Sequence, residues 1–136
     1  GKDRELFLKG VEVYSREGHC ITCHQPSGEG LPAAQFPPLA GSQWVTGSSE
    51  RLTKLVLHGM TGPVEVKGTR YPGTVPMIPF KHLSDDEIAG VLTYIRNAFG
   101  HRASVVTPAQ VQATRKVTQK QTNFYTPEQL LQEHPK

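Results

Sequence analysis

The sequence predicts an all-α fold in which three main helices are joined by long loops. Apolar residues recur at helical spacing in three segments, and residue types typical of helix starts and helix ends flank those segments. The 13 glycines and 11 prolines gather between the segments, so much of the chain should be loop. Only 36% of the 136 residues are apolar, so a core made of protein alone would be thin.

The first predicted helix covers residues 3–18, where apolar side chains fall on one face and Asp3 can cap the start. A shorter helix is predicted over residues 49–58. Gly59 follows it directly, and glycine is common just beyond the end of a helix. The apolar stripe of this second helix consists of Leu52, Leu55 and Val56.

The strongest helical pattern begins at Ser84, which forms a capping box with Glu87, and it should end at Gly100. Two later Thr-Pro pairs, at 107–108 and 126–127, are typical helix starts because proline is favoured at the first helical position. The apolar stripe of the helix that starts at Ser84 contains Ile88, Val91, Leu92, Ile95 and Phe99.

The segments between the helices have distinct signals. Residues 25–49 are rich in glycine and proline and should be irregular. Residues 63–72 resemble a small hairpin that turns at a Lys-Gly pair. Residues 74–80 contain two prolines, so they should form an extended loop with an apolar centre. Residues 115–123 are polar and are also expected to be extended.

The charge pattern favours a solvated polar surface over a nucleic-acid-binding face. The chain has 15 basic and 12 acidic residues, a net charge of +3, and no clustered basic stripe. No stretch approaches the roughly 18 apolar residues of a membrane span, and no signal peptide is visible. Gly1 is not a natural start, so we expect a processed or excised piece that a leader or anchor once preceded.

The two cysteines lie three residues apart, at Cys20 and Cys23, and His24 follows directly. This C-x-x-C-H pattern is typical of covalent haem c attachment. Two thiols one helical turn apart can each add to one vinyl group of the haem, and the next residue can then direct its imidazole at the iron. The motif therefore predicts one covalent haem per chain, with His24 as an axial ligand.

Other uses of the cysteine pair fit less well. A thioredoxin-like redox pair needs a strand before it and a helix after it, whereas here a predicted helix precedes and a Pro/Gly loop follows. A structural zinc site needs about four ligands. Cys20, Cys23, His24 and His19 would supply them from a very short stretch, with poor geometry.

The sixth iron position can be open or filled by a side chain. Met77 is favoured because it lies in the proline-flanked loop before the strongest helix, and such a loop can hold a thioether rigidly over the haem. Met60 follows a helix end and fits the usual role of methionine as a core filler. The other ligands available in principle are His58, His82, His101 and His134.

With these residues, the chain resembles class I mono-haem cytochromes c over roughly residues 5–103. Two stretches, 57–63 and 83–97, resemble the cytochrome c domains that serve periplasmic dehydrogenases and copper nitrite reductases. The chain departs from those domains at Ile78, because their axial methionine is often followed directly by proline. The resemblance is carried by Gly10, Tyr14, Cys20, Cys23, His24, Pro37, Pro38, Leu39, Ala40, Gly41, Met77 and Tyr94.

The resemblance implies a cytochrome c fold around one haem and a role for each matching residue. His24 and Met77 would bind the iron, and the Pro37 carbonyl would accept a hydrogen bond from the His24 ring. Gly10 would let the first helix cross the last one near Tyr94. Leu39, Leu55, Val56 and Phe80 would pack on the macrocycle, and Trp44, Arg51 and Tyr71 would hold the propionates.

The implied function is one-electron transfer without substrate catalysis, between a periplasmic redox enzyme and another redox protein. A dehydrogenase, a nitrite reductase or a terminal oxidase would be the partner, in the periplasm or another extracytoplasmic space. Residues 1–103 would form the domain, and residues 104–136 an extension packed on the domain or on a partner. The alternatives are an open sixth site, as in a gas sensor or a peroxidase-like protein, or a dehydrogenase subunit that uses this extension to hold its enzyme.

Overall fold

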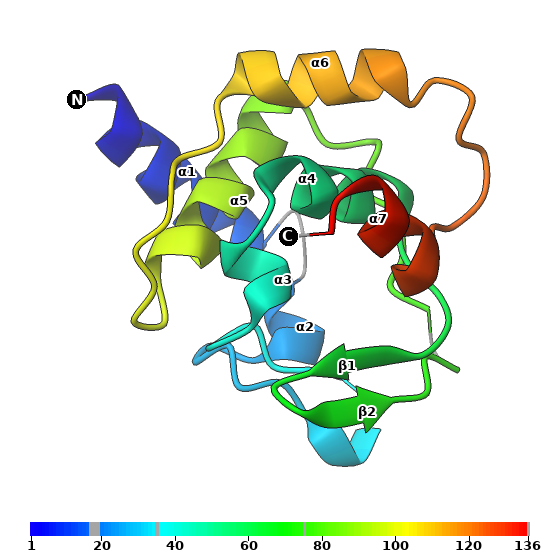
Figure 1. Ribbon diagram of the computed structural model, residues 1–136. Coiled ribbons are helices and arrows are strands. Elements are labelled where there is room, and N and C mark those ends of the chain that lie inside the picture. Colours follow the sequence, from blue (N-terminus) through cyan, green and yellow to red (C-terminus); the bar gives the residue numbers. More distant parts are fainter. Residues whose placement is uncertain (17–19, 35, 75, 136) are drawn as a thin grey trace.

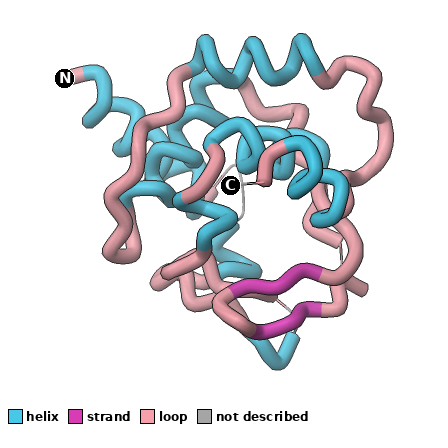
Figure 2. Tube along the Cα trace, viewed as in Figure 1, coloured by secondary structure: helices cyan, strands magenta, loops and turns pink. Residues whose placement is uncertain are grey.

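The computed structural model describes residues 1–16, 20–34, 36–74 and 76–135, and it confirms the all-α prediction (Figure 1). Helices dominate the chain, and the sheet in the described residues is a single two-stranded hairpin (Figure 2). No helix in those residues is both long enough and apolar enough to cross a membrane. The elements are α1 (Lys2–Ser15), α2 (Cys20–His24), the 3₁₀ turn η1 (Pro32–Ala34), α3 (Gln43–Thr46), α4 (Ser49–His58), β1 (Val64–Val66), β2 (Thr69–Tyr71), α5 (Asp85–Asn97), α6 (Pro108–Val117) and α7 (Pro127–Glu133).

The helices α1 and α5 cross closely at Gly10. A Cβ atom at this position would lie 2.0 Å from the carbonyl oxygen of Gly90 and 2.5 Å from Cβ of Tyr94, so only glycine permits the contact. The crossing is therefore set by a residue that would otherwise cost about 1 kcal/mol of helix stability relative to alanine. Around it, the ring of Tyr94 contacts the rings of Phe7, Tyr14 and Phe99, with centroids 5.2–5.7 Å apart.

Several predicted element ends are corrected by the structure. The cap of α1 is Gly1, so the prediction that Asp3 caps this helix is wrong. Asp3 instead lies in the first turn, where its negative charge interacts favourably with the helix dipole. The capping box of Ser84 and Glu87 is confirmed, with hydrogen bonds of 2.9 and 3.1 Å. However, α5 ends at Asn97 and not at Gly100.

Two segments contain more helix than predicted. Within residues 25–49, Ser42 accepts a hydrogen bond from the backbone of Trp44 and starts α3, so this stretch is not wholly irregular. Residues 115–123 are not all extended, because α6 continues to Val117. The predicted hairpin is confirmed, with Lys67 and Gly68 at positive φ in its turn as a tight hairpin requires.

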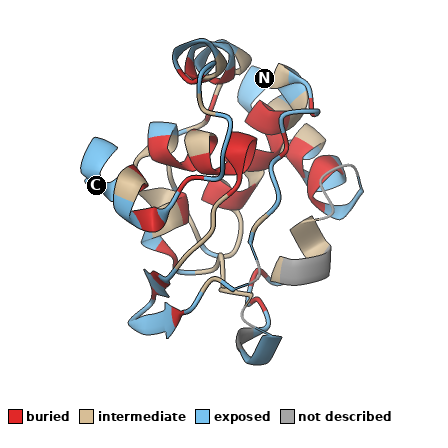
Figure 3. Cartoon of the chain, turned by 90° about the vertical axis from the view of Figure 1, so that its right-hand side faces the viewer, coloured by how far each residue is buried: buried red, intermediate tan, exposed pale blue. Residues whose placement is uncertain are grey.

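The segment predicted to be an extension packs back on the rest of the chain, as far as its described residues 104–135 show. Helix α6 crosses α4 and α5 at the top of Figure 1, and α7 lies against α4. The buried Arg96 joins the extension to the domain. Its guanidinium donates to the carbonyl and hydroxyl oxygens of Ser104 and to the carbonyls of Val45 and Gly47. The hairpin lies at the opposite end from α6, and most buried residues belong to the helices between them (Figure 3).

Candidate functional site

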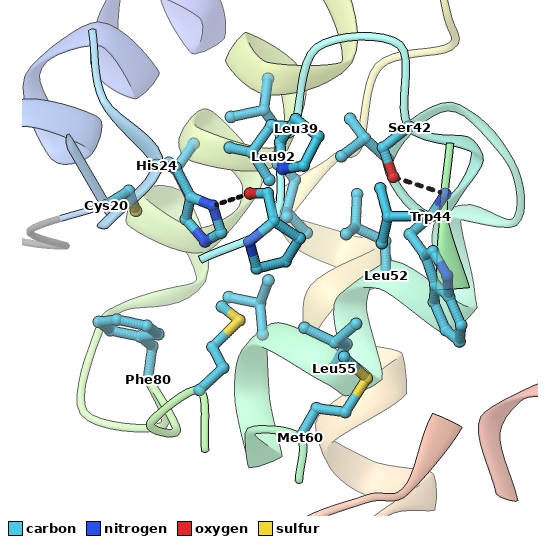
Figure 4. Close-up of a pocket in the computed structure, with 18 of the residues that line it drawn as sticks. Cys20, His24, Leu39, Ser42, Trp44, Leu52, Leu55, Met60, Phe80 and Leu92 are labelled. Atoms are coloured by element: carbon cyan, nitrogen blue, oxygen red, sulfur yellow. Dashed lines mark hydrogen bonds between the residues drawn. The ribbon is translucent and has the colours of Figure 1, made fainter. Parts of the chain in front are cut away.

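A cavity whose lining is almost wholly apolar lies between the helices and the hairpin. Residues from α2, α3, α4, α5, β1 and the intervening loops line it (Figure 4). The lining residues are Cys20, His24, Pro37, Pro38, Leu39, Ser42, Trp44, Val45, Leu52, Leu55, Val56, Met60, Val64, Val66, Met77, Phe80, Leu83, Val91, Leu92 and Ile95.

His24 ends α2, and its ring is held in one orientation. Nδ1 lies 2.9 Å from the carbonyl oxygen of Pro37 (Figure 4). Because a carbonyl only accepts hydrogen bonds, Nδ1 carries the proton and Nε2 keeps its lone pair. Gly30 makes this geometry possible, since a Cβ there would lie 2.6 Å from the same carbonyl oxygen.

The environment of His24 also favours the neutral ring that a metal needs. Burial lowers the pKa of His24 below its ordinary value, and the hydrogen bond to Pro37 offsets part of that effect. The backbone on both sides of the ring is fixed as well. The Tyr14 hydroxyl donates to the carbonyl of Gln25 at 2.6 Å, and the backbone N–H of Leu39 donates to the carbonyl of Gly28 at 2.7 Å.

Both methionines line the cavity, and their backbones pair with each other in an isolated antiparallel bridge. Their side chains have different neighbours. Met60 packs against the hairpin cluster of Val64, Val66 and Tyr71 as well as the main core, whereas Met77 packs only against the main core. In Figure 4, Met60 lies beside Leu55, at the far edge of the cavity from His24.

Most of the other predicted site residues meet at this cavity. Cys20 lines it, whereas the side chain of Cys23 lies outside the described part of the structure, as does the whole of His19. The predicted apolar contacts lie together in the lining: Leu39, Leu55, Val56 and Phe80.

The three candidates for holding propionates are placed less uniformly. Trp44 lines the cavity, but its indole Nε1 donates to a backbone carbonyl of β1 at 3.2 Å. Arg51 and Tyr71 are not in the lining. The guanidinium of Arg51 lies 4.7 Å from the centroid of the Trp44 ring and donates to the carbonyls of Gln43 and His134. Its Nε is buried without a hydrogen-bond partner among the described residues. The propionate role therefore stays a prediction.

Sequence reasoning missed the hairpin and much of α5 as cavity walls. Val64 and Val66 point inward from β1, and the alternating pattern of that strand, with Glu65 exposed between them, was the signal that could have found them. The apolar stripe of α5 was predicted from the sequence, but its position as a wall of the cavity was not. The α5 residues that face the cavity are Val91, Leu92 and Ile95.

The donor set of this cavity fits a haem. Imidazole and thioether are common axial ligands of haem iron, and both line an otherwise apolar space. The thiol of Cys20 lies at the same wall as the ring of His24, as covalent attachment through a C-x-x-C-H motif requires. A helical shell with such a cavity and motif defines a protein that carries covalent haem.

Comparisons with known proteins agree. The cytochrome c family model matches residues 7–99, and the chain belongs to the cytochrome c family. It is 38% identical to cytochrome c-552 of Thermus thermophilus over 133 residues, which cover 93% of this chain and 95% of that protein. It is 36% identical to the cytochrome c subunit of a quinone-type alcohol dehydrogenase from Gluconacetobacter polyoxogenes, over 79% of this chain but only 22% of that subunit.

The family identifies the cofactor and the type of activity. The chain carries a covalently bound haem c and transfers electrons, and it is not a substrate-converting enzyme. Because the cytochrome c-552 alignment covers 93% of the chain, it necessarily reaches into residues 104–136, beyond the end of the family match at residue 99. The extension is thus part of the similarity to that protein.

Proposed function

We propose that His24 and Met77 are the axial ligands of the haem iron and that Cys20 and Cys23 form the thioether bonds. One observation carries this proposal. Nδ1 of His24 is held by the Pro37 carbonyl, so Nε2 remains for a metal in a cavity that Met77 also lines. The bound haem supplies an Fe(II)/Fe(III) couple, and the protein sets its environment.

The residues around the cavity act on that couple in two ways. The Pro37 carbonyl orients the His24 ring and increases its basicity, as partners of metal-bound histidines commonly do. The apolar lining excludes water, which together with thioether ligation favours a raised reduction potential. Neither effect needs a substrate pocket, so the arrangement suits a carrier of single electrons.

The choice of Met77 over Met60 is supported by their surroundings. Met60 is partly buried against both the main core and the hairpin cluster, so it already has the packing role expected of a core methionine. Met77 has no contact with the hairpin cluster. Its backbone pairs with that of Met60, which would keep a thioether at one place.

We propose a redox enzyme as the partner, and a dehydrogenase in particular. The supporting observation is the similarity to cytochrome subunits of an alcohol dehydrogenase and of a fructose dehydrogenase, at 36% and 27% identity. A nitrite reductase or a terminal oxidase remains a prediction from the sequence resemblance. An extracytoplasmic location, such as the periplasm, suits a protein with covalent haem c.

The ligation proposal is tested by the absorption spectrum of the oxidised protein. A thioether–iron charge-transfer band should be present in the wild type and in Met60→Ala and absent from Met77→Ala. Met60→Ala is the matched control, because it removes the same side chain from the same cavity. A band that is lost in Met60→Ala and kept in Met77→Ala would show that Met60, and not Met77, is the axial ligand. A wild type without the band that binds CO readily would favour the open-site alternative.

A further inference from the structure

The backbone around Met60, which lies beside Met77, is paired with a different segment on each of its two edges. On one edge, Met60 and Met77 exchange N–H···O hydrogen bonds of 3.1 and 2.9 Å. On the other edge, Tyr125 of the extension donates to the Gly59 carbonyl at 3.1 Å and accepts from the Thr61 N–H at 2.9 Å. The backbones around residues 60, 77 and 125 thus form a small patch of paired segments, with Tyr125 and Met77 on its opposite edges.

The atoms around Gly59 leave no room for a side chain at this position of the patch. A Cβ atom there would lie 2.5 Å from the Met77 carbonyl oxygen and 2.7 Å from the ring of Phe124. Gly59 also has φ of +76°, which side-chain-bearing residues rarely adopt. The Met77 backbone and the extension therefore both approach the same glycine closely, and a shift of one changes the space available to the other.

The extension is itself fixed in this region. Tyr125 is only 3% exposed, and its ring contacts the ring of His58 edge-on at 5.6 Å. His58 in turn is hydrogen-bonded through Nε2 to Thr118 at 2.7 Å. These contacts secure the extension to the end of α4, directly before the paired segment.

The extension also fixes the chain on the far side of Met77. Arg115 of α6 forms an ion pair with Asp85 at 2.6 Å and donates to the backbone carbonyls of Lys81 and Leu83. The extension thus contacts the segment that pairs with Met77 and also the chain just after the Met77 loop.

We infer that the extension positions Met77, with Tyr125 as the main positioning residue, and so keeps the sixth position of the iron closed to small ligands. This inference rests on the proposed Met77 ligation. It assigns residues 104–136 a role inside the molecule, as the support of one haem ligand. In the absence of Tyr125 packing, the loop should open more often, and ligand binding should accelerate in proportion to the open fraction.

The test compares CO binding to the reduced holoprotein in Tyr125→Ala and Leu130→Ala. Leu130 is a fully buried residue of α7, so both variants remove a buried apolar side chain from the extension. Tyr125→Ala should bind CO at least about tenfold faster than the wild type, an opening change of about 1.4 kcal/mol. Leu130→Ala should stay within about twofold of the wild type. Tyr125→Phe, which keeps the ring, should restore slow binding.

A milder pair covers the case in which Tyr125→Ala does not fold. Phe124 and Leu131 are 38% and 41% exposed, but only the Phe124 ring contacts Gly59. Phe124→Ala should weaken the thioether–iron band and speed CO binding, whereas Leu131→Ala should change neither. Equal rates within each pair would overturn the inference. If Met77→Ala itself kept the band, the ligation proposal would fail first, so the two failures are distinguishable.

Discussion

The two sides of the cavity are built in different ways. On the His24 side, the contacts come from neighbouring parts of one loop: Pro37 accepts from His24, and Gly28 accepts from Leu39. On the Met77 side, the pairing joins three segments that are far apart in the sequence, around residues 60, 77 and 125. The contacts on the His24 side join residues that are close in the sequence. Those on the Met77 side require the C-terminal extension to pack back against residues 59–61.

This difference has a consequence for stability. Local contacts close short loops at little entropic cost, so the His24–Pro37 contact does not require the extension to be in place. The Met77 side requires the extension to be in place, because Tyr125 supplies one edge of the patch. We therefore expect damage to the helix crossing to affect the whole fold, and damage at Tyr125 to affect first the Met77 side.

The largest effect should come from Gly10→Ala, which strikes the helix crossing that supports the His24 side. Its new Cβ would lie 2.0 Å from the backbone of Gly90, which cannot rotate away. We expect a loss of about 4 kcal/mol in the free energy of unfolding. Gly90→Ala is the control, because its Cβ meets no atom closer than 3.1 Å and should cost about 1 kcal/mol. Denaturant unfolding of both variants measures the difference, and equal losses would contradict this account of the crossing.

The next effect tests the joint between the domain and the extension. Arg96 is 3% exposed and satisfies the carbonyls of Val45, Gly47 and Ser104. Arg96→Met keeps the apolar stem but leaves these carbonyls without their donor, for an expected loss of about 3 kcal/mol in unfolding free energy. The exposed Arg102 provides the control, because Arg102→Met should stay within about 0.5 kcal/mol of the wild type. A small loss in Arg96→Met would mean that other contacts hold the joint.

The local side of the cavity was the more predictable one from the sequence. The motif of Cys20, Cys23 and His24 has a fixed spacing, and the capping box of Ser84 depends on residues three apart. Such patterns describe contacts between near neighbours, so the sequence displays them directly. The crossing at Gly10 was also expected, although only through the family resemblance.

The remote side could not be predicted in the same way. Nothing near Tyr125 in the sequence indicates that its backbone pairs with Gly59 and Thr61, because the pairing depends on how far α6 carries the chain across the molecule. The presence of Met60 in the lining was also unexpected. Met60 reaches the cavity because its backbone pairs with Met77, and that register is a long-range property.

A smaller effect concerns the pH dependence of the contact between His58 and the extension. Burial lowers the pKa of His58, and the cations Lys81, Arg115 and Lys54 lower it further. The unfolded chain therefore binds more protons, so stability is complete above a pH of about 6.5 and falls as the pH drops toward the folded-state pKa. The Thr118 hydroxyl donates to the Thr114 carbonyl, so Nε2 of His58 must be the donor to Thr118.

His58→Gln isolates this effect, because an amide can also donate to Thr118 but does not titrate. As the pH falls below about 6.5, the wild type should lose more stability than the variant. The measurement is denaturant unfolding of both holoproteins at several pH values. Parallel pH curves would show that protonation of His58 does not loosen the attachment of the extension.

The smallest effect should come from the ion pair between Lys54 of α4 and Glu133 of α7, whose side chains are 3.0 Å apart. Glu133 is 40% exposed on its side chain, and partly exposed pairs contribute about 0.5 kcal/mol, less at high salt. Glu133→Gln should lower stability by no more than that, and the loss should vanish in about 1 M salt. Leu130 is fully buried in the same helix, so burial of apolar surface should hold α7 against α4. A loss of about 2 kcal/mol in Glu133→Gln would instead show that the ion pair with Lys54 is a main contact holding α7 against α4.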